Sequence, residues 1–186
     1  GHRIDLAAVP YETGRRATHI LLRLQTDEGL EGLGFTTLTT PAAWQAKPLV
    51  AAIDALAERA AGRDPHAVEA INAELMALGD GVMAGITNRA LSVVDIALWD
   101  LRGKALALPL WRLLGGGRNR VPVYASWKLW WNYDLPTLTK HAGEMLDQGF
   151  RAMKFRLGGV PDPAACAERT RVLDRKRTRL NSSHGY

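Results

Sequence analysis

Residues 87–106 read TNRALSVVDIALWDLRGKAL and carry the longest helical pattern of the 186-residue sequence. Apolar side chains recur at spacings of three and four, which predicts a helix with a continuous apolar stripe. The stripe consists of Leu91, Val94, Leu98, Leu101 and Ala105. Further apolar residues widen this surface, so we expect the helix to contact two layers of the fold. Asp95 lies beside the stripe, and we interpret it as a structural carboxylate that pairs with a backbone group or an arginine.

The sequence before this helix predicts a small sheet. Alternating side chains indicate strands at 3–9, 18–25 and 30–35. The turn Asp27-Glu28-Gly29 separates the last two strands, which is typical of a hairpin. Gly32 and Gly34 lie two residues apart on the last strand, so one of its faces is bare and another element can pack closely there.

Two further helices are predicted between the sheet and the long helix. Thr40-Pro41 and Asp64-Pro65 both show a capping residue followed by proline, which is typical of a helix start. We expect helices over 42–61 and from Pro65 to Leu78, each with an apolar face.

The pattern changes after Arg118 to alternating strands and helices. Strands are predicted at 121–126 and 150–157, and helices at 135–148 and 164–173. This order is typical of βα units in a parallel sheet or barrel. We therefore expect one domain over 1–118 and the start of a second over 119–173.

The second of these strands lies in the stretch Gly149-Phe-Arg-Ala-Met-Lys-Phe-Arg-Leu-Gly-Gly159 and carries two cations, Lys154 and Arg156. Residues two apart on a strand share a face, so both cations point the same way. On a covered parallel strand this arrangement is unfavourable unless the charges are paired or lie in a solvated cleft. Two interpretations stay open: a functional site, or the solvated face of an edge strand.

The composition excludes several classes of protein. The chain has 24 basic and 19 acidic residues, a net charge of +5, but four of the basic residues lie in 174–186 beside one acidic residue. The remainder shows no basic stripe with interleaved aromatic residues, so we expect no nucleic-acid partner. No apolar run is long enough for a membrane helix, so we expect no membrane partner. The single Cys166 forbids an internal disulfide and fits a cytoplasmic location.

Residues 174–186 are expected to be a non-native tail. They show no hydrophobic periodicity and resemble the translation of a sequencing adapter. We therefore leave them out of the fold prediction.

Two stretches resemble the mandelate racemase/muconate lactonising enzyme family of the enolase superfamily. The first is Ser92–Lys104 continuing through Pro109–Gly116, and the second is Lys154-Phe155-Arg156 after Gly149-Phe150. The resemblance covers 1–173. It implies an α+β N-terminal capping domain followed by the first two βα units of an incomplete TIM (β/α)₈ barrel. Since two units cannot close a barrel, it also implies a truncated fragment of a longer parent.

The resemblance implies chemistry as well. Family members remove the proton next to a carboxylate, and Mg²⁺ held by carboxylates of later barrel strands stabilises the resulting charge. This chain contains none of those metal ligands, so we expect the fragment itself to be inactive. Lys154 carries over as a catalytic residue near the substrate carboxylate or the metal site. Arg156 stands at the family's second lysine, the usual base, and is expected to stabilise charge because arginine is a poor base.

The implied partner is a small-molecule carboxylate such as a sugar acid or hydroxy acid. Loops of the capping domain close over the substrate in this family, so 11–16 and 36–40 are candidate specificity loops, with Arg15 and Arg16 as substrate-binding residues. Trp127 and Lys128 follow the first barrel strand and are further candidates. The resemblance also implies a homo-oligomeric parent.

Arg156 favours an acid-sugar dehydratase, because a racemase needs a base on each face of the substrate. A racemase or cycloisomerase of the same family is the alternative. A non-catalytic binding or assembly module, with the tryptophans of 127–131 at its interface, is a third possibility.

Overall fold

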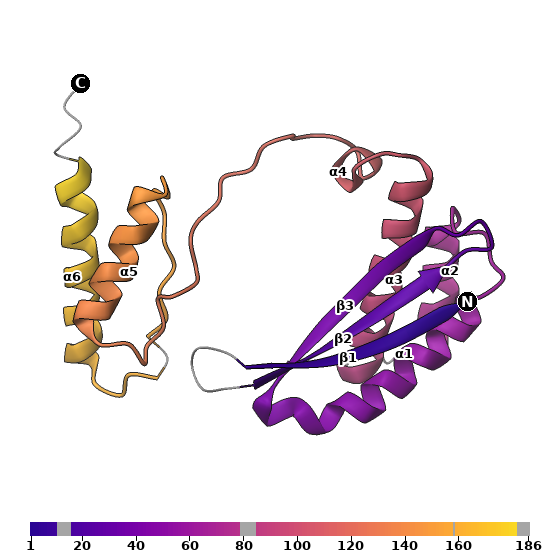
Figure 1. Ribbon diagram of the computed structural model, residues 1–186, viewed down its shortest axis with the longest axis horizontal. Helices are drawn as coiled ribbons and strands as arrows, with labels where there is room; N and C mark the ends of the chain where they lie inside the picture. The colour runs from indigo at the N-terminus through magenta and orange to yellow at the C-terminus, as the bar shows by residue number, and fades with distance from the viewer. Residues whose placement is uncertain (11–15, 79–84, 158, 182–186) are drawn as a thin grey trace. The chain divides into compact units, whose positions relative to one another are not determined.

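The computed structural model describes residues 1–10, 16–78, 85–157 and 159–181. The chain divides into two compact units, Gly1–Asn119 and Arg120–Tyr186 (Figure 1). Within the described ranges, no helix is both long and apolar enough to cross a membrane.

The first unit begins with an antiparallel sheet in the order β1-β2-β3. Its strands are β1 (His2–Pro10), β2 (Arg16–Gln25) and β3 (Glu31–Thr39). The predicted hairpin is confirmed, because the Thr26 main-chain N–H donates to the Leu30 carbonyl at 3.0 Å. Gly29 supports the turn with a φ of +84°, a conformation that favours glycine.

The predicted loop at 36–40 is wrong over its first four residues. β3 continues through Thr36–Thr39, and Thr36 pairs with Ile20 while Leu38 pairs with Thr18. β-branched threonines favour extended backbone, and Leu38 is only 1% exposed beneath the sheet. The other predicted loop, 11–16, lies outside the described residues except for Arg16, which begins β2.

Helical structure follows the sheet. The elements are η1 (Thr40–Gln45), α1 (Ala46–Ala60), α2 (Val68–Ala77), α3 (Gly85–Ala105) and the single turn α4 (Leu110–Leu113). The helix predicted over 42–61 is divided into a 3₁₀ turn and an α-helix. The residue at its cap is Thr39 rather than Thr40, and the Thr39 side chain makes no capping hydrogen bond. The long helix predicted over 87–106 is confirmed within two residues at each end.

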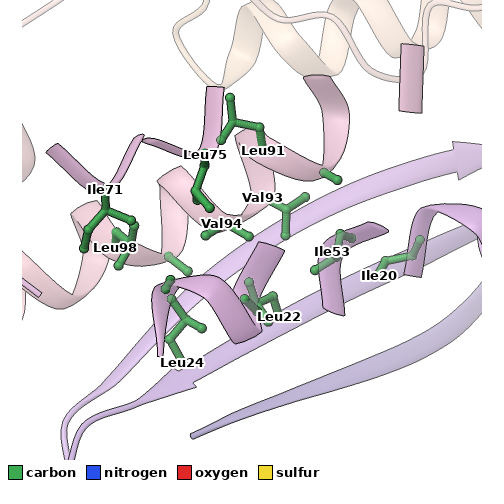
Figure 2. Close-up of a cluster of buried hydrophobic side chains, with 14 of the residues drawn as sticks. Ile20, Leu22, Leu24, Ile53, Ile71, Leu75, Leu91, Val93, Val94 and Leu98 are labelled. Atoms are coloured by element: carbon green, nitrogen blue, oxygen red, sulfur yellow. The ribbon is translucent and has the colours of Figure 1, made fainter. Parts of the chain in front are cut away.

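One face of the sheet is covered by α1 and α3 (Figure 1). Leu22 of β2, Ile53 of α1 and Val94 of α3 meet in a single buried cluster (Figure 2). Ile71 and Leu75 bring α2 to the same cluster from the far side of α3. The long helix therefore contacts two layers, as its wide apolar surface predicted.

The bare face of β3 permits the close approach of α3. A Cβ added to Gly34 would overlap the carbonyl oxygen of Val93, and one added to Gly32 would overlap that of Ala97. The prediction that an element packs on this glycine pair is confirmed. Any side chain at either position would push the helix away from the sheet.

The second unit contains α5 (Leu135–Asp147) and α6 (Pro163–Asn181). α5 begins and ends within one residue of its prediction, and Asp134 caps it by accepting a hydrogen bond from the Thr137 main-chain N–H at 2.9 Å. The helix predicted over 164–173 continues to Asn181, eight residues further. The non-native character of 174–186 stays a prediction.

The strands predicted at 121–126 and 150–157 are wrong as regular strands. These segments meet at one isolated parallel bridge, Ala125 with Met153. Two hydrogen bonds hold it, from the Ala125 N–H to the Ala152 carbonyl at 3.0 Å and from the Lys154 N–H to the Ala125 carbonyl at 2.8 Å. Among the described residues no third strand lies beside these two extended segments, so they gain little from a ladder and the pairing stays short. The bridge is parallel, which is the strand direction that a βα unit requires.

Candidate functional site

The candidate site lies in the second unit, on the segment that contains Lys154 and Arg156. The Arg156 main-chain N–H donates to the Leu129 carbonyl at 3.0 Å, so this segment is tied to the loop after the first predicted barrel strand. Leu129 is only 2% exposed and belongs to the apolar cluster beneath α5. The backbone on both sides of the candidate cations is therefore anchored.

Lys154 and Arg156 share one exposed face of their segment. Met153 and Phe155 alternate with them and pack against the cluster formed by α5 and its neighbours. Among the described residues, no carboxylate forms an ion pair with either cation. Two adjacent positive charges on one face suit an anionic ligand, although the same exposure also fits a solvated basic face.

The guanidinium of Arg156 lies over the indole ring of Trp130, 4.3 Å from its centroid. This cation–π contact orients the planar cation without neutralising its charge. The hydrogen-bond donors at the rim of the guanidinium stay available to a carboxylate or another oxygen anion.

The other two tryptophans of this loop also have intramolecular partners. Trp127 packs edge-on against Phe150, with ring centroids 5.3 Å apart. Trp131 covers Gly159, where an added Cβ would lie 2.5 Å from an atom of the indole ring. The tryptophans therefore support the local fold, but Trp127 and Trp131 remain exposed, and the interpretation of this loop as a binding module stays a prediction.

Lys128, a predicted substrate-binding residue, is fastened to α5. Its Nζ atom lies 3.8 Å from Glu144 Oε2, and its carbonyl accepts a hydrogen bond from His141 Nδ1 at 2.8 Å. Sequence reasoning missed both of these partners. The sequence did contain an indication of these partners. His141 lies on the apolar stripe of α5, between Leu138 and Met145, where a polar side chain needs a hydrogen-bond partner.

The remaining candidates belong to the first unit. Arg16 is exposed at the start of β2, opposite Pro10 of β1. Arg15 lies outside the described residues. The structure thus gathers Lys128, Lys154 and Arg156 in the second unit, while the role of Arg15 and Arg16 stays a prediction.

A cavity of about 620 Å³ also lies in the second unit, but it opens on the other side of the 150–157 segment. Met153 and Phe155 line it together with residues of α5 and α6. These are the side chains that alternate with the candidate cations, so the cavity is a separate feature from the candidate site.

The described residues do not fit a magnesium ion. Within these ranges, no group of three or more His, Cys, Asp or Glu side chains gathers closely enough to hold a metal. Mg²⁺ is bound by several oxygen ligands, carboxylates above all, and the candidate face carries cations instead. Asp95, beside the apolar stripe of the long helix, accepts a hydrogen bond from Asn72 Nδ2 at 2.7 Å. Its structural interpretation is confirmed, although the partner is an asparagine side chain.

Comparison with known proteins identifies the family. Residues 5–115 match the sequence profile described as mandelate racemase / muconate lactonizing enzyme, N-terminal domain. Together with the three-stranded sheet and its packed helices, this match defines the first unit as an enolase-superfamily N-terminal domain. The chain belongs to the mandelate racemase/muconate lactonizing enzyme family, as the resemblance predicted.

The similar proteins are enzymes of about twice this length or more. D-Galactarolactone cycloisomerase of Agrobacterium fabrum is 32% identical over 197 residues, which cover 100% of this chain and 50% of that protein. D-Mannonate dehydratase of Rhizorhabdus wittichii is 34% identical over 147 residues, covering 78% of this chain and 35% of the dehydratase. The crystal structure of a racemase from Streptomyces coelicolor A3(2) with bound magnesium has a TM-score of 0.82 at 30% identity, covering 95% of this chain and 51% of the racemase.

Proposed function

We propose that this chain is part of a Mg²⁺-dependent enzyme that removes the proton next to a carboxylate, and that it dehydrates a sugar acid. Its relatives include a cycloisomerase named for D-galactarolactone and a dehydratase named for D-mannonate. A similar racemase was crystallised with magnesium. These proteins support the reaction class but differ in the step that follows proton removal.

Arg156 is the observation that favours dehydration. Arginine is a poor general base because its planar guanidinium keeps its positive charge. Held flat over Trp130, it presents a fixed positive charge to an oxygen anion. Racemisation needs a base on each face of the substrate, whereas dehydration needs one base and an acid for the departing hydroxyl. Arg156 therefore supports the dehydratase over the racemase or cycloisomerase.

Lys154 and Arg156 would act together on the substrate. In the proposed reaction a base takes the proton from the carbon beside the carboxylate, and the hydroxyl on the next carbon leaves as water. The enol that results tautomerises to a 2-keto acid. Negative charge grows on the carboxylate oxygens as the proton leaves, and two fixed cations on one face stabilise this charge. Trp127, Lys128, Arg15 and Arg16 are the proposed substrate contacts.

The proposal places the start of a TIM barrel at 119–173. The parallel bridge between Ala125 and Met153 supports it, as does α5 between the bridged segments. The metal ligands and the base would come from further barrel strands, since the described residues do not fit the ion. A bound magnesium ion would supply the positive charge that makes the proton beside the carboxylate acidic. A homo-oligomeric, cytoplasmic parent stays a prediction.

The test is an assay of the chain joined to the reading frame that follows it in its gene. With Mg²⁺ and a panel of aldonic and aldaric acids in D₂O, we expect a 2-keto-3-deoxy acid from at least one substrate. The 186-residue chain alone is the control and should give no turnover. Deuterium at the carbon beside the carboxylate with no loss of water would support the racemase. Absence of both products from every substrate would contradict the proposal.

Substitution of Arg156 tests its role. Arg156→Lys keeps the charge but not the planar stack on Trp130, and Arg156→Leu removes the charge. We expect turnover to fall about 10-fold or more for the first and at least 100-fold for the second, the range seen when one charge-stabilising group is lost. If Arg156→Leu turns over normally, this residue has no part in the reaction.

A further inference from the structure

Lys128 adopts an unusual backbone conformation. Its φ is +56°, in the left-handed region that side chains with a Cβ rarely occupy. Among the residues that the structure describes, Lys128 and Ala107 are the two non-glycine residues with a positive φ. Such a conformation persists only where the surroundings hold it in place, and it often marks a functional site.

Two side chains of α5 hold this turn. The Lys128 carbonyl oxygen can only accept, so the Nδ1 atom of His141 must carry the proton of their 2.8 Å hydrogen bond. Glu144 lies one helical turn further along α5 and approaches the Lys128 ammonium at 3.8 Å. The ring of His141 also packs edge-on against Tyr133, with centroids 5.1 Å apart, which limits its rotation.

The far side of the same turn contacts Arg156. Leu129, the next residue, accepts a hydrogen bond from the Arg156 main-chain N–H at 3.0 Å. Trp130, one residue later, places its ring beneath the Arg156 guanidinium. Leu129 and Trp130 follow Lys128 directly, so the left-handed backbone of Lys128 influences the direction in which the chain continues to both residues.

We propose that His141 is a positioning residue for Arg156. By holding the Lys128 carbonyl, His141 fixes the left-handed turn, and the turn places the Trp130 ring where it orients the guanidinium. His141 contacts Lys128 and Tyr133, so it would act on Arg156 through the turn and not by touching the cation. The consequence for catalysis rests on the proposed function, whereas the link from His141 to Arg156 does not.

The experiment measures the orientation of Arg156 without any enzyme assay. In the ¹⁵N-labelled 186-residue chain, the ring current of Trp130 shifts the Nε–H resonance of Arg156. This resonance is assigned by its disappearance from the spectrum of Arg156→Lys. Trp130→Leu defines the unshifted position. We expect His141→Leu to remove most of the shift, although both stacked residues are intact. His141→Asn retains a donor near the place of Nδ1 and should restore most of the shift.

A second variant separates positioning from packing. Lys128→Gly allows the positive φ without restraint, so His141→Leu should move the Arg156 resonance less in that background than in the natural chain. Equal shifts in both backgrounds would show that His141 acts through packing alone. If His141→Leu leaves the Arg156 signal at its wild-type position, while Trp130→Leu moves it to the unshifted position, the proposal is overturned.

A measurement on the natural chain covers the case in which His141→Leu fails to fold. Long-range ¹H–¹⁵N correlation of the imidazole reports which ring nitrogen carries the proton. We expect the Nδ1 resonance of His141 to have the chemical shift of a protonated ring nitrogen. An unprotonated Nδ1 would overturn the proposal by itself. Because these spectra require no turnover, failure of the dehydratase assay would leave their result unchanged.

Discussion

The carboxylate of Asp100 on α3 accepts a hydrogen bond from the main-chain N–H of Leu33 on β3 at 2.8 Å. β3 is an edge strand, so this N–H has no neighbouring strand to donate to. Lys104, four residues further along α3, donates to the same carboxylate and to the Glu31 carbonyl, both at 2.7 Å. Asp100 and Lys104 therefore provide hydrogen-bond partners for one N–H and one carbonyl at the edge of the sheet, where a fourth strand would otherwise do so.

Removal of this carboxylate should destabilise the first unit. We expect Asp100→Ala to lower the free energy of unfolding by about 1–3 kcal/mol, because it leaves a partly buried N–H and an ammonium without their acceptor. Asp100→Asn should lose less, since an amide oxygen still accepts. Urea titration followed by circular dichroism measures the difference. Glu58→Ala, which removes an exposed carboxylate of α1, is the matched control, and an equal loss in both variants would contradict the prediction.

The contact between Gly34 and α3 should tolerate no side chain. A Cβ there meets the main-chain carbonyl of Val93, which cannot move without displacing the helix. We expect Gly34→Ala to lower the free energy of unfolding by about 3 kcal/mol, at the upper end for overpacking. Gly117→Ala, where an added Cβ meets nothing within 4 Å, should be close to neutral. Thermal unfolding of both variants would show whether they differ.

Acid should weaken the start of α5. Hydrogen bonds from the Thr137 hydroxyl and then from its main-chain N–H hold the pKa of Asp134 below its ordinary value of 3.8. The unfolded chain therefore binds the proton at higher pH than the folded chain does. The stabilisation is complete above about pH 4 and is lost as the pH falls through the lowered pKa of the folded state.

The variants for this prediction are Asp134→Asn and Thr137→Ala. The first should remove the contribution of this carboxyl to the pH dependence of unfolding. The second keeps the main-chain donor and should remove only part of it. Unfolding followed at several pH values between about 2 and 6 measures the slope, and an unchanged slope in Asp134→Asn would refute the assignment.

The packing of Trp131 on Gly159 should also be disrupted by an added side chain. A methyl group at Gly159 would overlap the indole ring, so Gly159→Ala should expel Trp131 from its place. We expect greater quenching of tryptophan fluorescence by acrylamide in this variant. The increase should be absent when the same substitution is made in a Trp131→Phe background. An increase that persists there would mean that another tryptophan has moved.

Much of the first unit followed from local pattern. The spacing of Gly32 and Gly34 predicted a close approach, and the stripe on 87–106 predicted the helix that makes it. The strand through Thr36–Thr39 was missed because three threonines and a single leucine resemble a loop. Their pairing with β2 becomes visible only when the register is known.

The candidate site was predicted less completely. The period of two placed Lys154 and Arg156 on one face, and the residues between them do pack on the other. The stack of Arg156 on Trp130 and the hydrogen bond of His141 to Lys128 carried no such signal. Both contacts join segments whose relative direction depends on the turn at Lys128. A glycine would have indicated such a turn in the sequence, but the residue there is a lysine.

Periodicity and spacing thus determine which faces of this chain are apolar and where its longest helices lie, because these properties depend on residues that are near neighbours along the chain. The pairing of Asp100 with Leu33 joins residues 67 apart. It exists only because two glycines allow α3 to lie against β3 at a single depth and angle. Tertiary packing therefore selects the partners of the polar groups, and those partners orient the charge that the proposed reaction requires.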